Sequence, residues 1–152
     1  MISILQSYFI YISFLTPFLF GASSFGSIET NPDFPDAVYQ ILDDKSGEMR
    51  SEIEFYRRGN ELRARIKTVR SGHEDAKCNN CPERFDGKKL LGMDLIWGLK
   101  WDGSRWSGGS ILDVDNGKIY NCRLNSFSKN EVVIRAYIGR PLFGETLTWY
   151  SE

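Results

Sequence analysis

Three cysteines are the residues of this 152-residue chain whose type and spacing best suit chemistry. Cys78 and Cys81 form a Cys-x-x-Cys motif, and Cys122 lies alone further along the chain. Such motifs serve disulfides, thiol redox centres and zinc sites. A redox centre places its first cysteine at the start of a helix, whereas residues 82–87 are typical of a loop. We therefore predict a structural disulfide that involves Cys78 or Cys81, and we favour a bridge between these two over a bridge to Cys122.

The other candidate residues do not support a metal or catalytic centre. His73 is the only histidine, and together with the three cysteines it lacks the paired spacing of structural zinc motifs. No serine or cysteine has a spacing that places it in a triad with His73. The Cys-x-x-Cys motif also lacks the following histidine of a haem attachment site. We expect no metal, no cofactor, no catalytic residue and no enzymatic activity.

Three aspartates could carry acid–base chemistry, but their positions indicate structural roles. Asp113 and Asp115 flank a predicted turn, where carboxylates commonly accept hydrogen bonds from backbone N–H groups. Asp94 lies in the middle of a predicted strand and needs a partner if it faces inward, since an isolated buried carboxylate is very costly. The sequence does not bring them together as a catalytic pair.

The chain divides into three segments. Residues 1–25 contain no charged side chain and end near small residues at 21–24, which predicts a signal peptide and export to the periplasm or the medium. The stretch 4–22 is also long enough to span a bilayer, so an uncleaved anchor is the alternative. Residues 26–36 hold two prolines and no periodicity, which predicts a lead-in linker. Residues 37–152 are expected to form one domain.

The charge of the chain bears on its partners. The formal net charge is −1, and no run of lysine or arginine interrupts the sequence. Nucleic-acid binding is therefore not expected. Once the signal peptide is removed, we also expect no stable insertion into a membrane.

Residues 89–124 carry the clearest structural pattern. The apolar residues at 91, 93, 95, 97 and 99 alternate with other residues, so we expect them to share one face of a strand. Asp-Gly at 102–103 and Asp-Asn-Gly at 115–117 favour tight hairpin turns. The stretch predicts three successive antiparallel strands.

Short strands are also expected at 37–42, 50–56, 62–67, 131–138 and 145–150. Glutamates at 52 and 54 and basic residues at 63, 65 and 67 are expected to pair across a solvated outer surface. Residues 71–88 lack periodicity, and so long a loop is usually functional or restrained by a covalent link. With about eight strands and no helix pattern, the chain predicts an all-β fold, a single up-and-down antiparallel barrel.

Several motifs resemble a known family. They are Leu-Gly-Met at 91–93, Ile-Trp-Gly-Leu at 96–99, Trp-Ser-Gly-Gly at 106–109, Asn-Gly-Lys-Ile-Tyr at 116–120, Arg-Ala-Tyr-Ile-Gly at 135–139 and Leu-Phe-Gly-Glu-Thr-Leu-Thr-Trp at 142–149. Their order over residues 36–150 resembles the small exported bacterial proteins of domain of unknown function family 2147 (DUF2147). The resemblance implies a lipocalin-like barrel and brings no enzymatic activity. One departure is Ala37-Val38-Tyr39, which stands where the family usually has Gly-x-Trp.

The interior of an eight-stranded barrel either packs solid or holds one small ligand. The candidate ligand-binding residues of this lumen are Phe55, Met93, Leu95, Trp97, Trp106, Tyr120 and Ile134. We expect Arg135 to lay its guanidinium over Tyr39 or Trp149 and so to close one end of the barrel.

Two function hypotheses follow. In the first, the protein is an exported barrel that binds a small, largely apolar ligand in its lumen. In the alternative, it is a non-enzymatic envelope or interaction protein with a filled barrel that acts through its outer face or the 72–88 loop. A continuous apolar cavity inside the barrel favours the first hypothesis, and an interior filled by side chains favours the second.

Overall fold

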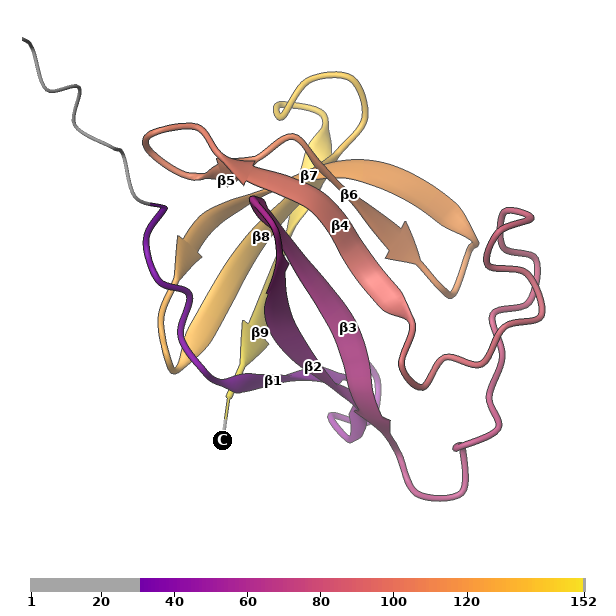
Figure 1. The fold of residues 1–152 in the computed structure, drawn as a ribbon. Coiled ribbons are helices and arrows are strands. Elements are labelled where there is room, and N and C mark those ends of the chain that lie inside the picture. Colours follow the sequence, from indigo (N-terminus) through magenta and orange to yellow (C-terminus); the bar gives the residue numbers. More distant parts are fainter. Residues whose placement is uncertain (1–30, 152) are drawn as a thin grey trace, which may run out of the picture.

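The computed structural model describes residues 31–151 as a closed antiparallel β-barrel (Figure 1). Its strands are β1 (Val38–Leu42), β2 (Met49–Arg58), β3 (Glu61–Val69), β4 (Asp94–Trp101), β5 (Trp106–Ser107), β6 (Gly109–Asp113), β7 (Lys118–Phe127), β8 (Glu131–Tyr137) and β9 (Gly144–Tyr150). Strands that follow each other pair, and β9 pairs with β1 to close the sheet. Because β5 and β6 form one strand that is interrupted at Gly108, the barrel counts as eight-stranded. The predicted fold class is confirmed.

The predicted turns join these strands. Asp102 accepts a hydrogen bond from the backbone N–H of Ser104 at 3.0 Å, and Asp113 accepts one from the N–H of Asp115 at 2.9 Å. The hydroxyls of Ser107 and Ser104, together with backbone N–H groups, hold the pKa of Asp102 well below its usual range. Asp102 and Asp113 therefore stabilise turns.

Of the two glutamates predicted to form charge pairs between β2 and β3, Glu54 does so on the outer surface, whereas Glu52 accepts a hydrogen bond from the hydroxyl of Thr68 at 2.6 Å. Glu54 accepts a hydrogen bond from Nε of Arg65 at 2.6 Å and lies 3.7 Å from Nζ of Lys67. The hydrogen bond from Arg65 lowers the pKa of Glu54. Pairs exposed to this degree stabilise a fold by about 1 kcal/mol or less, so they support the register of the two strands more than the stability of the barrel.

Buried side chains from every strand meet inside the barrel. The cluster consists of Tyr39, Ile53, Leu62, Ala64, Ile66, Leu95, Ile96, Leu99, Trp106, Ile111, Cys122, Leu124, Val132, Ile134, Ala136 and Trp149. Burial of so much apolar surface is the main force that holds a barrel of this size together.

Phe34, in the irregular segment before β1, inserts into one end of this interior. Its ring stacks on Phe55 with centroids 4.5 Å apart and on Phe127 with centroids 5.0 Å apart. Tyr39 meets Phe55 edge-on at 5.8 Å and donates a hydrogen bond from its hydroxyl to the carbonyl of Ser128 at 2.6 Å. The part of the lead-in that the structure describes therefore plugs the barrel. The predicted signal peptide at residues 1–25 lies outside the described residues.

A β-bulge in β4 changes which side chains face inward. Leu62 pairs with Leu99 and Ala64 pairs with Ile96, so three steps along β4 oppose two along β3. Gly98 lies inside the bulge and has a φ of 76°, which favours glycine. Ile96 and Leu99 consequently both point into the core. A second register shift follows, because Ala64 pairs with Ile96 and Arg65 with Asp94, and the adjacent Leu95 and Ile96 both belong to the interior cluster. The expectation that residues 91–99 present one alternating face is wrong, and these two irregularities are the reason.

Candidate functional site

Two cavities stand out in the described part of the chain, and both open to solvent outside the barrel. The larger, of about 570 Å³, lies between the outer face of β3–β4 and the segment that connects these strands. We call it the outer groove. Its lining residues are Tyr56, Arg63, Arg65, Arg84, Phe85, Lys88, Lys89, Leu91, Gly92, Met93, Asp94 and Trp97. In Figure 1 the connecting segment stands beside the barrel wall, next to β4 and the β6–β7 turn.

The connecting segment is held to the barrel at several points. Cys78 and Cys81 form a disulfide with Cα atoms 5.8 Å apart. Cys78 packs with Met93 and Leu112 in a second, smaller buried cluster on the outside of β4 and β6. Gly117 lies so close to the carbonyl of Asn80 that a Cβ atom there would overlap it. The segment is therefore a fixed wall of the groove, as the predicted disulfide suggested.

The barrel wall of the groove is a network of charged and aromatic groups. Asp94 accepts a hydrogen bond from the hydroxyl of Tyr56 at 2.7 Å and from Arg63 at 3.2 Å. Desolvation and the bond to Asp94 raise the pKa of Tyr56, so it stays a neutral donor. Arg65 lies over the Tyr56 ring at 4.8 Å. Asp94 therefore has hydrogen-bond partners in Tyr56 and Arg63. It faces the outside of the barrel and not the interior.

From the connecting segment, Arg84 contacts two aromatic rings, Phe85 on the same segment and Trp97 on β4 of the barrel wall. The guanidinium of Arg84 lies 4.4 Å from the ring centroid of Phe85 and 4.3 Å from that of Trp97. The two rings are tilted at 41° with centroids 5.4 Å apart. The N–H groups of a guanidinium lie in its own plane, so stacking of its face on aromatic rings leaves them free to donate to an anion.

The groove carries more positive than negative charge. Its lining contains Arg63, Arg65, Arg84, Lys88 and Lys89 against a single carboxylate. Three of these cations pair with carboxylates: Arg63 with two acids, Arg65 with one and Lys89 with one. Arg84 and Lys88 have no ion-pair partner among the described residues. The outer surface expected to be merely solvated therefore includes a groove with two free cations.

The predicted lumen residues fall into two groups. Leu95, Trp106 and Ile134 are buried in the interior cluster, and Phe55 and Tyr120 pack against it. Met93 and Trp97 instead belong to the second cluster outside the barrel. Trp97 pairs with Ser110, whereas its neighbour Ile96 pairs with Ile111 and faces the core. The expected convergence of all seven side chains on one interior does not occur.

The predicted stack of Arg135 on Tyr39 or Trp149 is wrong. Arg135 alternates with the buried Ile134 and therefore points outward, where it donates hydrogen bonds to the carbonyls of Pro141 at 2.9 Å and Leu142 at 3.2 Å.

An arginine does close one end of the barrel, but it is Arg57. Its guanidinium lies 5.1 Å from the centroid of the buried Trp106 ring and donates to the carbonyls of Asn31 and Pro32. A sequence signal for this contact is hard to find, because Arg57 is one of several basic residues in the β2–β3 hairpin.

Cys122 remains a free thiol inside the barrel. It is fully buried, and burial raises the pKa of its thiol to about 12. His73 is exposed in the connecting segment. Within residues 31–151, no three His, Cys, Asp or Glu side chains gather to hold a metal ion.

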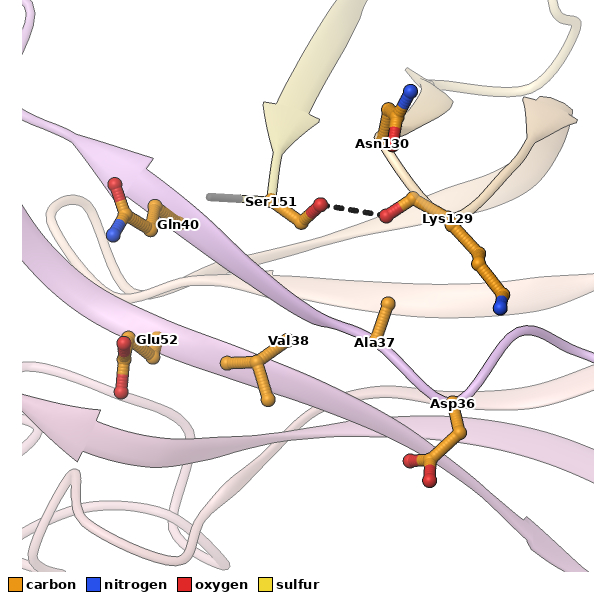
Figure 2. A pocket seen from close by; sticks show the side chains of 8 residues that line it. All are labelled: Asp36, Ala37, Val38, Gln40, Glu52, Lys129, Asn130 and Ser151. Atoms are coloured by element: carbon orange, nitrogen blue, oxygen red, sulfur yellow. Dashed lines mark hydrogen bonds between the residues drawn. The ribbon is translucent and has the colours of Figure 1, made fainter.

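The second cavity, of about 440 Å³, lies at the seam between β1 and β9 (Figure 2). These strands share one paired position, Gln40 with Tyr150. The hydroxyl of Ser151 donates to the carbonyl of Lys129 at 2.6 Å across its rim. Its lining is mostly polar and contains no aromatic side chain, so it offers less for ligand recognition than the outer groove.

The comparisons with known proteins agree with this architecture. The profile of a family described as "Uncharacterized protein conserved in bacteria (DUF2147)" matches residues 39–151. The chain belongs to the DUF2147 family. Its structure is similar to that of HP1028, a protein from the human pathogen Helicobacter pylori that is described as a member of the lipocalin family. The TM-score is 0.61 at 18% identity, over 80% of this chain and 84% of HP1028.

This likeness shows the fold that the DUF2147 chain shares with HP1028, a lipocalin-like barrel. No curated protein matches the chain. In its described part, no helix has the length and apolar character needed to cross a membrane.

Proposed function

We propose that this DUF2147 protein is a non-enzymatic binding protein whose outer groove takes an organic anion with an apolar portion. The observation that carries the proposal is Arg84, a cation without an acidic partner in the described chain that lies on the rings of Phe85 and Trp97. Lys88 adds a second free cation. Leu91, Met93 and the ring edges supply an apolar surface.

The size and composition of the groove support this proposal. A volume of about 570 Å³ lies within the usual range for small-ligand sites. Recognition of an anion by a stacked arginine combines charge with directed hydrogen bonds. The hydrogen bonds among Tyr56, Arg63 and Asp94 fix these side chains on the barrel wall. Binding a ligand therefore costs little conformational entropy there.

The interior is a weaker candidate for the ligand. Trp106, Ile134 and Leu99 are fully buried in contact with neighbouring side chains, and the stacked ring of Phe34 plugs one end. A ligand in the lumen would have to displace these contacts, whereas a ligand in the groove displaces only water.

Export belongs to the proposal as well. The uncharged apolar segment at residues 1–25 supports it. The Cys78–Cys81 disulfide supports it too, because disulfides form and persist in oxidising compartments. N-terminal sequencing of protein recovered from the host should find a chain that begins near residues 22–27. An intact Met1 in the membrane fraction would contradict cleavage.

The direct test uses a matched ligand pair, dansyl-undecanoic acid and its neutral methyl ester. We expect the acid to bind at least tenfold more tightly than the ester, since a charge-assisted hydrogen bond contributes about 1.5–3 kcal/mol. Arg84→Gln should remove most of this preference. Lys100→Gln, an exposed change on β4 outside the groove, is the control. Equal affinity for acid and ester in every variant would refute the anion site.

A further inference from the structure

The hairpin between β8 and β9 carries an unusual set of exposed side chains. Ile138, Leu142 and Phe143 are exposed to 67%, 79% and 66%. We call residues 138–143 the β8–β9 tip. In Figure 1 the tip rises clear of the barrel wall as a loop at the top of the molecule. Three large apolar side chains held in water on one short turn call for a partner that covers them.

Three backbone N–H groups of the tip are paired within it. The N–H of Ile138 donates to the carbonyl of Phe143, the N–H of Phe143 to that of Arg140, and the N–H of Arg140 to that of Ile138, at 2.8–2.9 Å. Pro141 has no N–H group. These bonds leave few backbone groups of the tip that depend on water.

Arg135 satisfies two further carbonyls of the tip. Its Nε donates to the carbonyl of Pro141 at 2.9 Å, and its Nη2 donates to that of Leu142 at 3.2 Å. Its Nη1 donates to the hydroxyl of Thr146 at 3.1 Å. One side chain thus fixes the shape of the tip and occupies the acceptors that would otherwise hold water at its most exposed point.

These features fit a lipid bilayer. Backbone groups that leave water must be paired internally, because hydrocarbon offers no hydrogen-bond partners. Apolar side chains beside a cation are the usual composition of elements that sit at the membrane surface. Arg140 is the one charged residue in the tip, and the absence of an acidic residue there suits an anionic headgroup.

A protein partner fits less well. A specific protein interface needs about 800 Å² on each side, more than a six-residue turn with three apolar side chains presents. A convex tip also offers no pocket for a partner's side chain. In contrast to the expectation from the sequence that the mature chain does not insert stably into a membrane, we propose that the β8–β9 tip inserts into the interfacial region of an anionic membrane surface and holds the barrel there. This inference is independent of the outer groove.

The first experiment places an environment-sensitive probe in the tip. Cys78 and Cys81 are bridged and Cys122 is buried, so Leu142→Cys supplies the accessible thiol for a nitrobenzoxadiazole label. Vesicles of phosphatidylcholine and phosphatidylglycerol should shift the emission to shorter wavelength and raise its intensity. The same label at Lys45→Cys, in the β1–β2 turn, should not respond. This readout reports on the tip even if residues 1–25 remain attached.

The second experiment measures co-sedimentation with the same vesicles. Leu142→Ser with Phe143→Ser should reduce the partition coefficient at least tenfold, whereas Tyr150→Ser, an exposed aromatic on β9 outside the tip, should not. Arg135→Lys keeps the charge but lacks the planar fork from which Arg135 donates to two carbonyls and to Thr146, so it should also weaken binding.

Two results would overturn the inference. One is a label at position 142 that does not respond to vesicles. The other is a tip variant that keeps its vesicle affinity but loses self-association in sedimentation equilibrium, which would assign the tip to contacts between copies of the chain.

Discussion

Arg84 lies 4.3 Å from the ring centroid of Trp97 and so joins the segment between β3 and β4 to the outer wall of the barrel. The contact exists because the bulge at Gly98 turns Trp97 outward, away from the interior cluster. It also means that a tryptophan expected in the lumen contributes to the outer groove instead.

Two tryptophan substitutions should therefore differ in their effects. Trp106→Ala removes a fully buried ring and should cost about 3–5 kcal/mol of unfolding free energy. Trp97→Ala removes a partly exposed ring and should cost less, about 1–3 kcal/mol, while abolishing the binding of the dansyl acid. Denaturant unfolding and fluorescence titration of both variants check this. A Trp97→Ala variant that binds normally would contradict the role of Trp97 in the groove.

The Cys78–Cys81 disulfide should matter more to the groove than to the barrel. It closes a loop of only a few residues, so its loss should cost about 2 kcal/mol or less. Reduction should still loosen the wall that carries Arg84 and Phe85 and weaken acid binding several-fold. Titrations with and without dithiothreitol test this, and the Cys78→Ala, Cys81→Ala double variant controls for effects of the reductant on the ligand. A collapse of the whole barrel on reduction would contradict this division.

The plug formed by Phe34 should exclude apolar ligands from the interior. Phe34→Ala removes two stacked contacts and should lower stability by about 2–4 kcal/mol. It should also allow the neutral methyl ester to bind inside the barrel, because a cavity lined by Phe55 and Phe127 opens. Isothermal titration with the ester on both proteins measures this. Tight ester binding by the unmutated protein would show that the plug does not block the interior.

Arg57 should stabilise the same end through Trp106 and the lead-in. Arg57→Ala removes a cation–π contact and the hydrogen bonds to Asn31 and Pro32, and should cost about 1–2 kcal/mol. Arg57→Met keeps most of the apolar stem and should cost less. Thermal unfolding of the two variants decides whether the charge or the stem contributes more.

The free thiol of Cys122 sets a pH dependence at the alkaline side. Its pKa is raised to about 12 in the folded protein by burial, against about 8.5 in an unfolded chain. Below about pH 8.5 the thiol is neutral in both states and contributes no pH dependence. As the pH rises from there towards 12, ionisation favours the unfolded chain and stability falls. Cys122→Ala should remove this part of the alkaline loss, measured by urea unfolding between pH 8 and pH 10.

Counting reactive thiols tests the predicted state of the three cysteines. Native protein at pH 8 should react slowly with iodoacetamide, because Cys122 is buried and the other two cysteines are bridged. After unfolding without reductant a single thiol should react. Three reactive thiols would exclude the disulfide.

The sequence was informative about the scaffold because hairpin barrels depend on local signals. Asp102 and Asp113 sit at turns whose chemistry is local. The strand predicted at 131–138 is present as β8, and its alternation places Arg135 on the face opposite Ile134, although we expected Arg135 to stack on Tyr39 or Trp149. The same alternation failed in β4, since a bulge adds one residue and reverses the faces beyond it. A glycine at position 98 is compatible with a bulge, but glycine alone does not predict one.

The outer groove could not be predicted for a different reason. Arg84 and Phe85 lie in a segment without periodicity, and their contacts with Trp97 depend on how that segment returns over the barrel wall. A disulfide near them was predictable from residue type, whereas the position of the loop depends on long-range packing of Cys78, Met93 and Leu112.

The central claim is that ligand binds outside the barrel, and the four tryptophans can report on it. Each indole N–H gives its own signal in a nitrogen–proton correlation spectrum, assignable from single Trp→Phe variants. Addition of dansyl-undecanoic acid should shift the signal of Trp97 and leave those of Trp106 and Trp149, in the interior, where they were. Shifts of Trp106 and Trp149 with Trp97 unmoved would place the ligand in the lumen and contradict the account.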